Sequence, residues 1–178
     1  MKYKLLLLLL LMAFSIKAQK ISRLDKVSSN DTIAPGRAII CGSFIQRLGF
    51  KSGGFAQEIY IADTATKQIY AFRVKPIFKS EKDNLFAYHI KPGTYAILKY
   101  QYLQSTWYGS KDFHEPIVKS NGPYYIFTVP ENSLVNLGIW HFEKQPGSFE
   151  DSSQELTDKL ALEFKNLNMS NAVVVLPR

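Results

Sequence analysis

The chain has 178 residues, and its 22 Lys and Arg against 15 Asp and Glu give a formal net charge of +7. Hydrophobic residues make up 46% of the sequence and charged residues 21%, which excludes an intrinsically disordered chain. A single cysteine excludes an intramolecular disulfide and a zinc site built from cysteines. No apolar run reaches the roughly 18 residues that a membrane-spanning helix needs, so we expect no membrane span.

The first 18 residues have the pattern of a secretory signal peptide. Lys2 and Lys4 precede an apolar run with seven consecutive leucines, and the small residue Ala18 ends the segment. We expect cleavage between Ala18 and Gln19, and an exported protein that is periplasmic, cell-surface or extracellular. An uncleaved anchor is the alternative, but the apolar run is too short to span a bilayer.

Cleavage would also change the charge balance. Residues 1–18 contain three lysines, so 19 basic against 15 acidic residues would remain and the net charge would fall to +4. The remaining basic residues are scattered singly, whereas proteins that bind nucleic acids usually concentrate them on one face. We therefore expect no nucleic-acid partner.

The mature chain divides into a short tether and one domain. Residues 19–34 are mostly polar and end before Pro35 and Gly36, which are typical loop residues. We interpret this segment as a flexible tether. A single domain then spans residues 35–178, close to the commonest domain size.

Residues 37–143 consist of short aromatic and β-branched runs separated by Gly, Pro, Asn and Asp, which is typical of strands. The predicted strands are Arg37–Gln46, Gln57–Ala62, Gln68–Val74, Leu85–Ile90, Tyr95–Leu103, Tyr124–Val129 and Leu134–Glu143. Short connections at 63–67, 91–94 and 130–133 predict three hairpins. We therefore expect a mainly β fold, an antiparallel β-sandwich of about seven to eight strands.

Two residues in the predicted strands have expected structural roles. Cys41 lies in an apolar run, so we expect a buried, inert thiol, with a reactive or intermolecular thiol as the alternative. Tyr95 follows the Pro92-Gly93 turn, where a tyrosine often hydrogen-bonds nearby backbone as in the tyrosine corner of sandwiches.

The C-terminal region changes to helical periodicity. Ser152 and Glu155 form a possible capping box, and we predict one α-helix over residues 152–167. The predicted apolar face of this helix consists of Leu156, Leu160, Phe164 and Leu167. A last short strand is expected at residues 172–176.

The segment Ile90-Lys91-Pro92-Gly93-Thr94-Tyr95 resembles the prealbumin-like and carboxypeptidase-regulatory-like sandwiches of secreted bacterial proteins. The element order, with the Gly-aromatic segment at 137–142 and the late helix, is similar to a bacterial family of small exported proteins and lipoproteins of unknown function. This resemblance implies a non-enzymatic exported module and carries no catalytic residues. A lipid-attachment cysteine is missing at the end of the signal peptide, which puts membrane anchoring in doubt.

We find no sequence motif that indicates catalysis or a cofactor. The three histidines are His89, His114 and His141, and no Gly-x-Ser-x-Gly motif accompanies them. Pro116 after His114-Glu115 excludes a His-Glu-x-x-His zinc helix. Asp112, His114 and Glu115 offer hard ligands to a cation, but polar loop residues are usually solvated. We therefore expect no enzyme, cofactor or metal.

Residues 104–123 have no clear periodicity and predict a long loop, a kind of segment that is often functional. Aromatic residues with polar atoms gather there, and Tyr100 and Tyr102 lead into it on one face of their strand. The candidate residues for binding a partner are Tyr100, Tyr102, Trp107, Tyr108, Phe113 and His114. They either bind a protein or glycan partner or fold down and cover one end of the sandwich.

We therefore expect an exported binding module for a protein or glycan partner. A structural envelope component without a small ligand, or a hydrolase with an unrecognised site, is the alternative, and the oligomeric state stays open. Asp31-Thr32-Ile33 and Asp63-Thr64-Ala65 resemble acceptor sites for O-linked glycans on some exported bacterial proteins, although chance matches to so short a pattern are common.

Overall fold

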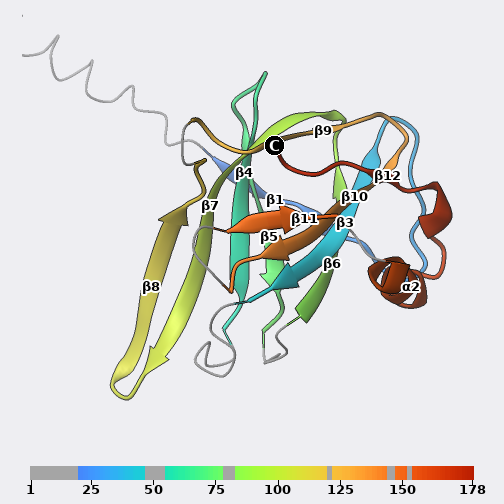
Figure 1. Ribbon diagram of the computed structural model, residues 1–178. Coiled ribbons are helices and arrows are strands. Elements are labelled where there is room, and N and C mark those ends of the chain that lie inside the picture. Colours follow the sequence, from blue (N-terminus) through green and yellow to red (C-terminus); the bar gives the residue numbers. More distant parts are fainter. Residues whose placement is uncertain (1–19, 47–54, 78–82, 120–121, 144–146, 152–153) are drawn as a thin grey trace, which may run out of the picture.

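The computed structural model describes residues 20–46, 55–77, 83–119, 122–143, 147–151 and 154–178. The predicted signal peptide and its cleavage site lie outside these residues. Two β-sheets form a sandwich, and one α-helix, α2 (Gln154–Glu163), lies beside it near the C-terminus (Figure 1). The predicted mainly β fold with one late helix is confirmed. No helix among the described residues is long and apolar enough to span a membrane.

Each sheet has six strands. The first has the order β1-β5-β4-β7-β8 with β9 also paired to β7, and the second has the order β11-β10-β3-β6-β2 with β12 also paired to β10. The strands of the first sheet are β1 (Ile21–Arg23), β4 (Gln57–Asp63), β5 (Ile69–Lys75), β7 (Gly93–Thr106), β8 (Gly109–Pro116) and β9 (Ile126–Val129). Those of the second are β2 (Asp25–Lys26), β3 (Ala38–Ile45), β6 (Asp83–Ile90), β10 (Leu134–His141), β11 (Ser148–Glu150) and β12 (Val173–Val174).

The connections between strands differ from the predicted hairpins. Of the three predicted turns, only the one at 63–67 joins paired strands, β4 and β5. The turns at 91–94 and 130–133 instead lead from one sheet to the other, because β6 and β10 belong to the second sheet and β7 and β9 to the first. Most pairs are antiparallel, while β1–β5, β3–β10 and β10–β12 are parallel. Strands in facing sheets bury alternate residues in the same core, so periodicity alone does not separate these arrangements.

The core between the sheets is strongly aromatic. Trp140 is completely buried, and its ring packs edge-to-face against Phe72 and Phe86 at centroid distances of 6.1 and 5.5 Å. Its indole N–H donates to the carbonyl of Leu137 at 3.0 Å, which satisfies the polar atom that burial would otherwise leave unpaired.

Strand β3 is buried on both faces. Ile40 and Phe44 pack in the core between the sheets, whereas Ile39 and Cys41 belong to a second apolar cluster on the other face. Burial raises the pKa of the Cys41 thiol to about 12, and the sulfur contacts the carbonyl of Val135 at 3.6 Å. The prediction of a buried Cys41 is confirmed, and the raised pKa keeps it a poorly reactive thiol.

The helix covers the outer face of the second sheet, next to β3 (Figure 1). Leu156 and Leu160 of α2 are buried in the second apolar cluster, as predicted. Phe164 and Leu167 are buried there too, but they follow the helix, which ends at Glu163 and is shorter than the predicted 152–167. The described helix begins at Gln154, and Ser152 of the predicted capping box lies outside the described residues. A short 3₁₀ turn, Met169–Asn171, and β12 follow it.

Tyr95 ties down the turn between β6 and β7, as predicted. Its hydroxyl donates to the carbonyl of Lys91 at 2.8 Å, and its ring is completely buried beside Phe127. Burial raises the pKa of this hydroxyl. The Pro-Gly-x-Tyr segment therefore acts through packing and one backbone hydrogen bond.

Residues 20–34 are part of the folded domain, so the prediction of a flexible tether is wrong for this segment. Strand β1 pairs with β5 of one sheet and β2 pairs with β6 of the other. Val27 is buried in the second apolar cluster, and the Asp31 carboxylate lies 3.1 Å from His89 Nε2 and accepts from the Ser28 N–H. Strands of two and three residues are too short to show a periodic pattern.

We predict that Asp31→Asn lowers the free energy of unfolding at pH 7. The contacts with Ser28 and His89 lower the pKa of Asp31 below its ordinary 3.8, so its contribution is complete above that value and is lost as the pH falls through the lowered pKa. Denaturant unfolding should therefore show a gap between the two proteins at pH 7 that closes below about pH 4. Asp25→Asn on exposed β2 is the control, and a gap that stays constant with pH would contradict this role.

Candidate functional site

Strands β7 and β8 form a two-stranded arm that extends beyond the body of the sandwich (Figure 1). The pairing of β7 with β4 ends at Tyr102, opposite Gln57. The pairing of β7 with β8 continues to Thr106, opposite Gly109. We call residues 103–112, which pair only with each other, the arm.

The prediction of a long loop over residues 104–123 is wrong for much of this segment. Much of this segment is strand, in the last part of β7 and all of β8. Strand β8 has polar residues on both faces, so its sequence lacks the alternation that indicates a half-buried strand. The turn at Trp107-Tyr108 also lacks the Asn-Gly or Asp-Gly pair that usually indicates a hairpin.

Stacked rings connect the arm to the core. Tyr100 lies 5.5 Å from Phe44 and 4.8 Å from Tyr102, as ring centroid distances. Tyr102 in turn stacks on Phe113 of β8 at 5.0 Å with an interplanar angle of 11°. Tyr100 is completely buried and Tyr102 is 5% exposed, so these two candidate residues belong to the core and do not present an open ring to a partner.

Buried hydrogen bonds hold Tyr100, the innermost tyrosine of this stack, in place. The Tyr100 hydroxyl donates to the Gln57 amide oxygen, and the Gln57 amide donates to Gln46 at 2.6 Å. Lys75 of β5 lies opposite Gln57, and its buried amine donates to the carbonyl of Phe55 at 2.7 Å. Burial lowers the pKa of Lys75. Satisfied polar groups of this kind hold neighbouring side chains in one arrangement.

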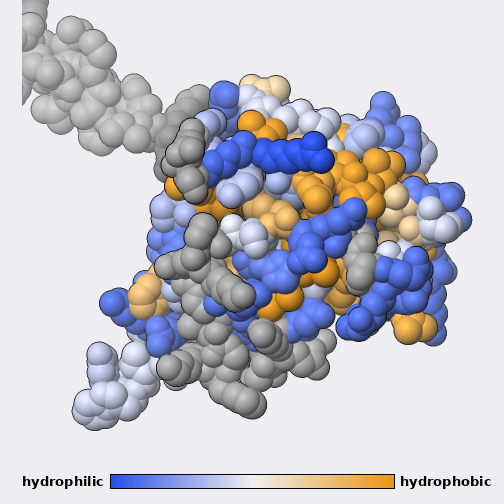
Figure 2. All heavy atoms as spheres, viewed as in Figure 1, coloured by the Kyte–Doolittle hydropathy of each residue, from blue (hydrophilic) through white to orange (hydrophobic). Residues whose placement is uncertain are grey.

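The tip of the arm exposes two large aromatic side chains. Trp107 is 95% exposed and Tyr108 is 77% exposed, and their rings meet edge-to-face at 5.2 Å with an angle of 88°. The arm stands away from the rest of the surface (Figure 2). Of the two alternatives for this segment, binding a partner or covering the sandwich, Trp107 and Tyr108 do not cover the sandwich, because both are exposed.

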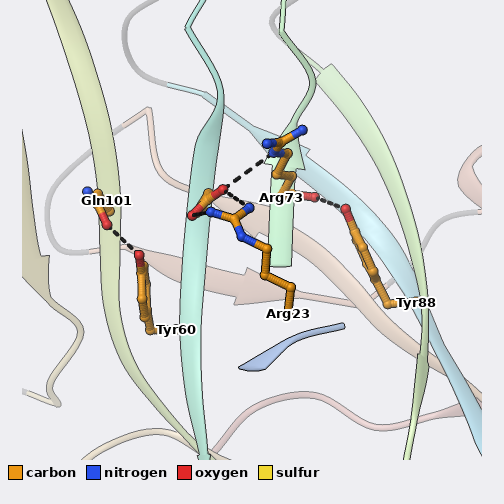
Figure 3. A network of polar contacts seen from close by, with 6 residues as sticks. Arg23, Tyr60, Arg73, Tyr88 and Gln101 are labelled. Carbon is orange, nitrogen blue, oxygen red and sulfur yellow. Dashed lines mark hydrogen bonds and ion pairs between the residues drawn. The ribbon is translucent and has the colours of Figure 1, made fainter. Parts of the chain in front are cut away.

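The arm root, residues 99–102 of β7 with residues 113–116 of β8, has a network of polar side chains on its outer face. The Lys99 amine lies 2.9 Å from His114 Nδ1, and His114 Nε2 lies 3.1 Å from Asp112. The Gln101 amide donates to both oxygens of Asp112, and the Tyr60 hydroxyl donates to Gln101 at 2.6 Å (Figure 3). Candidate residue His114 thus stabilises the pairing of β7 with β8.

Farther along the same sheet, the Glu58 carboxylate binds two arginines. Arg23 of β1 donates to it at 2.6 and 3.2 Å, and Arg73 of β5 donates at 3.4 Å (Figure 3). The hydrogen bond and the charge of Glu58 raise the pKa of Arg23. Because these residues come from β1, β5 and β4, the group fastens the N-terminal strand to the sheet that carries the arm.

A cavity of about 280 Å³ opens beside the arm root. Its lining residues are Phe55, Ala56, Glu58, Ile77, Gln101, Tyr102 and Leu103. The Glu58 carboxylate is already paired with arginines, and the Gln101 amide is bonded to Asp112 and Tyr60, so the cavity offers mainly apolar walls. Its volume is slightly below the range usual for small-molecule sites, and it suits one apolar side chain better than a cofactor.

The possible cation ligands on β8 do not converge. Asp112 and His114 point to the outer face, whereas Glu115 accepts from the Tyr102 hydroxyl at 2.5 Å on the other face. In the part of the chain that the structure describes, no group of three or more His, Cys, Asp or Glu is arranged to hold a metal ion. The alternation of side chains along a strand separates neighbours such as His114 and Glu115.

The other two histidines have carboxylate partners far from the arm in the sequence. His89 pairs with Asp31 as described above. His141 Nδ1 lies 2.8 Å from Glu143, and its Nε2 lies 3.0 Å from Glu150 of β11. These contacts join His141 to the neighbouring strand.

The possible glycan acceptor segment at 63–65 lies in the turn between β4 and β5, and the segment at 31–33 follows a turn over residues 28–31. The Asp63 carboxylate accepts from the backbone N–H groups of Ala65 and Thr66, and the Thr64 hydroxyl donates to the carbonyl of Thr94 at 3.1 Å. Thr32 is exposed. These residues fix a turn, and their modification stays a prediction.

Sequence reasoning missed Lys99, Gln101 and Glu58 as parts of this region. One available signal was the strict alternation of polar Lys99 and Gln101 with Tyr100 and Tyr102, which predicts a polar outer face on β7. The partners of these residues come from strands far away in the sequence, so their network could not be found from local pattern.

Comparisons with known proteins do not extend this description. No family model matches the sequence, and no curated protein matches it. Among solved structures, the chain is similar to part of a leucine-rich repeat protein from Bacteroides thetaiotaomicron, with 10% sequence identity and a TM-score of 0.39. The match covers 72% of this chain and 16% of that protein. A similarity this small carries no argument about function.

We predict that the aromatic residues of the arm divide into two classes. Tyr102→Ala should lower the free energy of unfolding by about 3–5 kcal/mol, because it removes a buried ring between the core and Phe113. The double variant Trp107→Ala/Tyr108→Ala should stay within about 0.5 kcal/mol of the wild type, because both side chains are exposed. Urea unfolding measures both values, and a large loss in the double variant would mean that the tip packs against the body.

Proposed function

We propose that the protein is an exported, non-enzymatic binding module that holds a protein partner through the tip of the arm. The observation that carries this proposal is the 95% exposure of Trp107 at the end of an ordered two-stranded arm. Exposing an indole ring to water is unfavourable, and tryptophan and tyrosine are the residues that most often dominate protein interfaces.

The arm root supports a defined position for the tip. The ring stack from Phe44 to Phe113 holds its inner face, and the polar group around His114 holds its outer face. An isolated two-stranded hairpin is marginally stable in water, so these contacts are what keep the arm extended. A preorganised arm loses less conformational entropy on binding than a mobile loop does.

The geometry favours a protein over a glycan as the partner. Sugar rings stack on an open aromatic face, whereas Trp107 and Tyr108 meet at 88° on a protruding tip. Such a tip fits a pocket in a partner protein. The small apolar cavity beside the arm root offers a second contact, large enough for one side chain of the partner.

Export is part of the proposal and rests on the N-terminal sequence. The basic start, the leucine run and Ala18 are the components of a signal peptide. The resemblance to small exported prealbumin-like proteins supports the same interpretation and implies no catalytic residues. A structural envelope component would share this location but would not need an exposed aromatic tip.

Photo-cross-linking with a photoreactive phenylalanine analogue at position 107 tests whether the tip contacts a partner protein. In cells that produce the protein naturally, illumination should give one discrete adduct with another protein. The same analogue at position 162 on α2, where Leu162 is 74% exposed, is the control and should not give that adduct. Trp107→Ala/Tyr108→Ala should reduce binding of the identified partner at least about tenfold, which corresponds to losing about 1.4 kcal/mol.

Other outcomes of this experiment would contradict the proposal. The same adducts at positions 107 and 162 would indicate non-specific contact. A glycan array signal that depends on Trp107 and Tyr108, without a protein adduct, would assign the tip to a glycan.

Intact mass spectrometry tests export. Protein recovered from the periplasm or medium should have a mass that begins at Gln19, and Ala18→Glu should leave a longer precursor because signal peptidases require small residues at the cleavage site. A recovered protein that retains residues 1–18 would contradict cleavage. Additional sugar mass on the mature protein would identify glycosylation in the same spectrum.

A further inference from the structure

Strand β8 is the outer strand of its sheet, and no other described strand pairs along its free side (Figure 1). The Ile117 N–H donates to the carbonyl of Leu98 in β7 at 3.0 Å. Because N–H and C=O groups alternate between the two sides of an antiparallel strand, those of Ser110, Asp112 and His114 point away from β7. The free edge therefore presents a row of unpaired backbone groups that another strand can extend.

Charged side chains usually protect such an edge, but the order of charges on β8 is self-complementary. The sequence from 111 to 115 is Lys-Asp-Phe-His-Glu. When two copies of β8 run antiparallel with Phe113 at the centre, Lys111 lies opposite Glu115 of the second copy. In the same register, Asp112 lies opposite His114 of the second copy. Opposite charges directly across a strand pair are stabilising.

The backbone allows this register, and the charges favour it over the registers centred on Lys111, Asp112 or Glu115. Asp112 and His114 both have outward N–H and C=O groups, so they form a hydrogen-bonded pair across the interface. Pro116 has no N–H but still offers its carbonyl to Ser110 of the second copy. Centring the pair on Lys111, Asp112 or Glu115 would instead place like charges directly opposite each other, which is destabilising.

The same register covers exposed apolar surface. Counting outward from Phe113, Tyr108 lies level with Val118 of the second copy. Val118 is 48% exposed and forms a β-bridge with Tyr124, which is 40% exposed. Burying these side chains against the arm of the second copy adds apolar contact at each end of the paired strands.

We propose that two copies of the chain pair through β8, antiparallel and centred on Phe113, to form one continuous sheet. We assign the free edge to a second copy because, in this register, the charged residues of one β8 lie opposite residues of opposite charge in the other. This inference goes beyond the proposed function, because it concerns the edge of β8, with Tyr108 as the one tip residue beside the second copy, and sets the two tips at opposite ends of the dimer.

Sedimentation velocity over a concentration series tests the dimer with charge-reversed variants. The purified wild-type protein should reach twice the mass of one chain. Lys111→Glu and Glu115→Lys should each weaken dimerisation at least about tenfold, since each places two like-charged pairs in the homodimer. An equimolar mixture of these variants should restore the dimer to nearly wild-type affinity, because every reversed charge then meets an opposite one.

Matched charge reversals on the surface around the helix separate the loss of charge pairing between the two β8 strands from the effect of a changed net charge. Lys165→Glu and Glu163→Lys carry the same changes at exposed positions away from β8 and should leave dimerisation unchanged. Circular dichroism melting checks that all variants fold, which matters for Glu115→Lys because Glu115 accepts from the Tyr102 hydroxyl. Restoration by mixing also requires both variants to be folded.

Three results would overturn the dimer. The first is a wild-type protein that stays monomeric up to about 1 mM. The second is single variants that dimerise like the wild type, and the third is a mixture that shows no restoration. These results leave partner binding at Trp107 untouched, and a missing adduct at position 107 leaves the dimer untouched. The failure of one proposal is therefore distinguishable from the failure of the other.

Discussion

Strand β7 is the constraint on which the arrangement of this protein depends. It is the longest strand, and it pairs with β4 on one side and with β8 and β9 on the other. Its inner face carries Tyr95, Tyr100 and Tyr102 into the core, and its outer face carries Lys99 and Gln101. One strand thus fixes the sheet, supports the arm and separates an aromatic interior from a polar surface.

An element could be predicted from the sequence where the order of apolar and polar residues within it is enough to show which side chains are buried. The helix was one, because its apolar residues contact one surface only, and Cys41 was another, because β3 is apolar on both faces. Tyr95 was predictable because its hydrogen bond partner, Lys91, is local. In each case a few neighbouring residues in the sequence are enough to indicate whether the side chain is buried or what it contacts.

The elements that depend on distant partners were not predictable in this way. Strands β1 and β2 are too short for periodicity and are held by Glu58 and His89, far away in the sequence. Strand β8 has polar residues on both sides because it lies at an edge. The turns after β6 and β9 look like hairpin turns but change sheet, a difference that depends on which strands occupy the neighbouring positions.

The candidate site was predicted in part for the same reason. Composition indicated that aromatic residues gather around Trp107 and Tyr108, but it did not decide whether they are exposed or cover one end of the sandwich. It did not separate them from Tyr100 and Tyr102. A β-bulge in the β4–β7 ladder, between the pairs of Tyr60 and Ile61, shifts the register before Tyr100 and so decides which residues of β7 face the core.

The pairing of the first strands also constrains the order in which the chain can fold. Strand β1 needs β5, β2 needs β6, and β3 needs both β6 and β10, so the N-terminal strands are not all paired until residue 141 is present. Contacts between residues so far apart in sequence make folding slow. A chain that closes late stays extended longer after synthesis, which would suit the export that we propose.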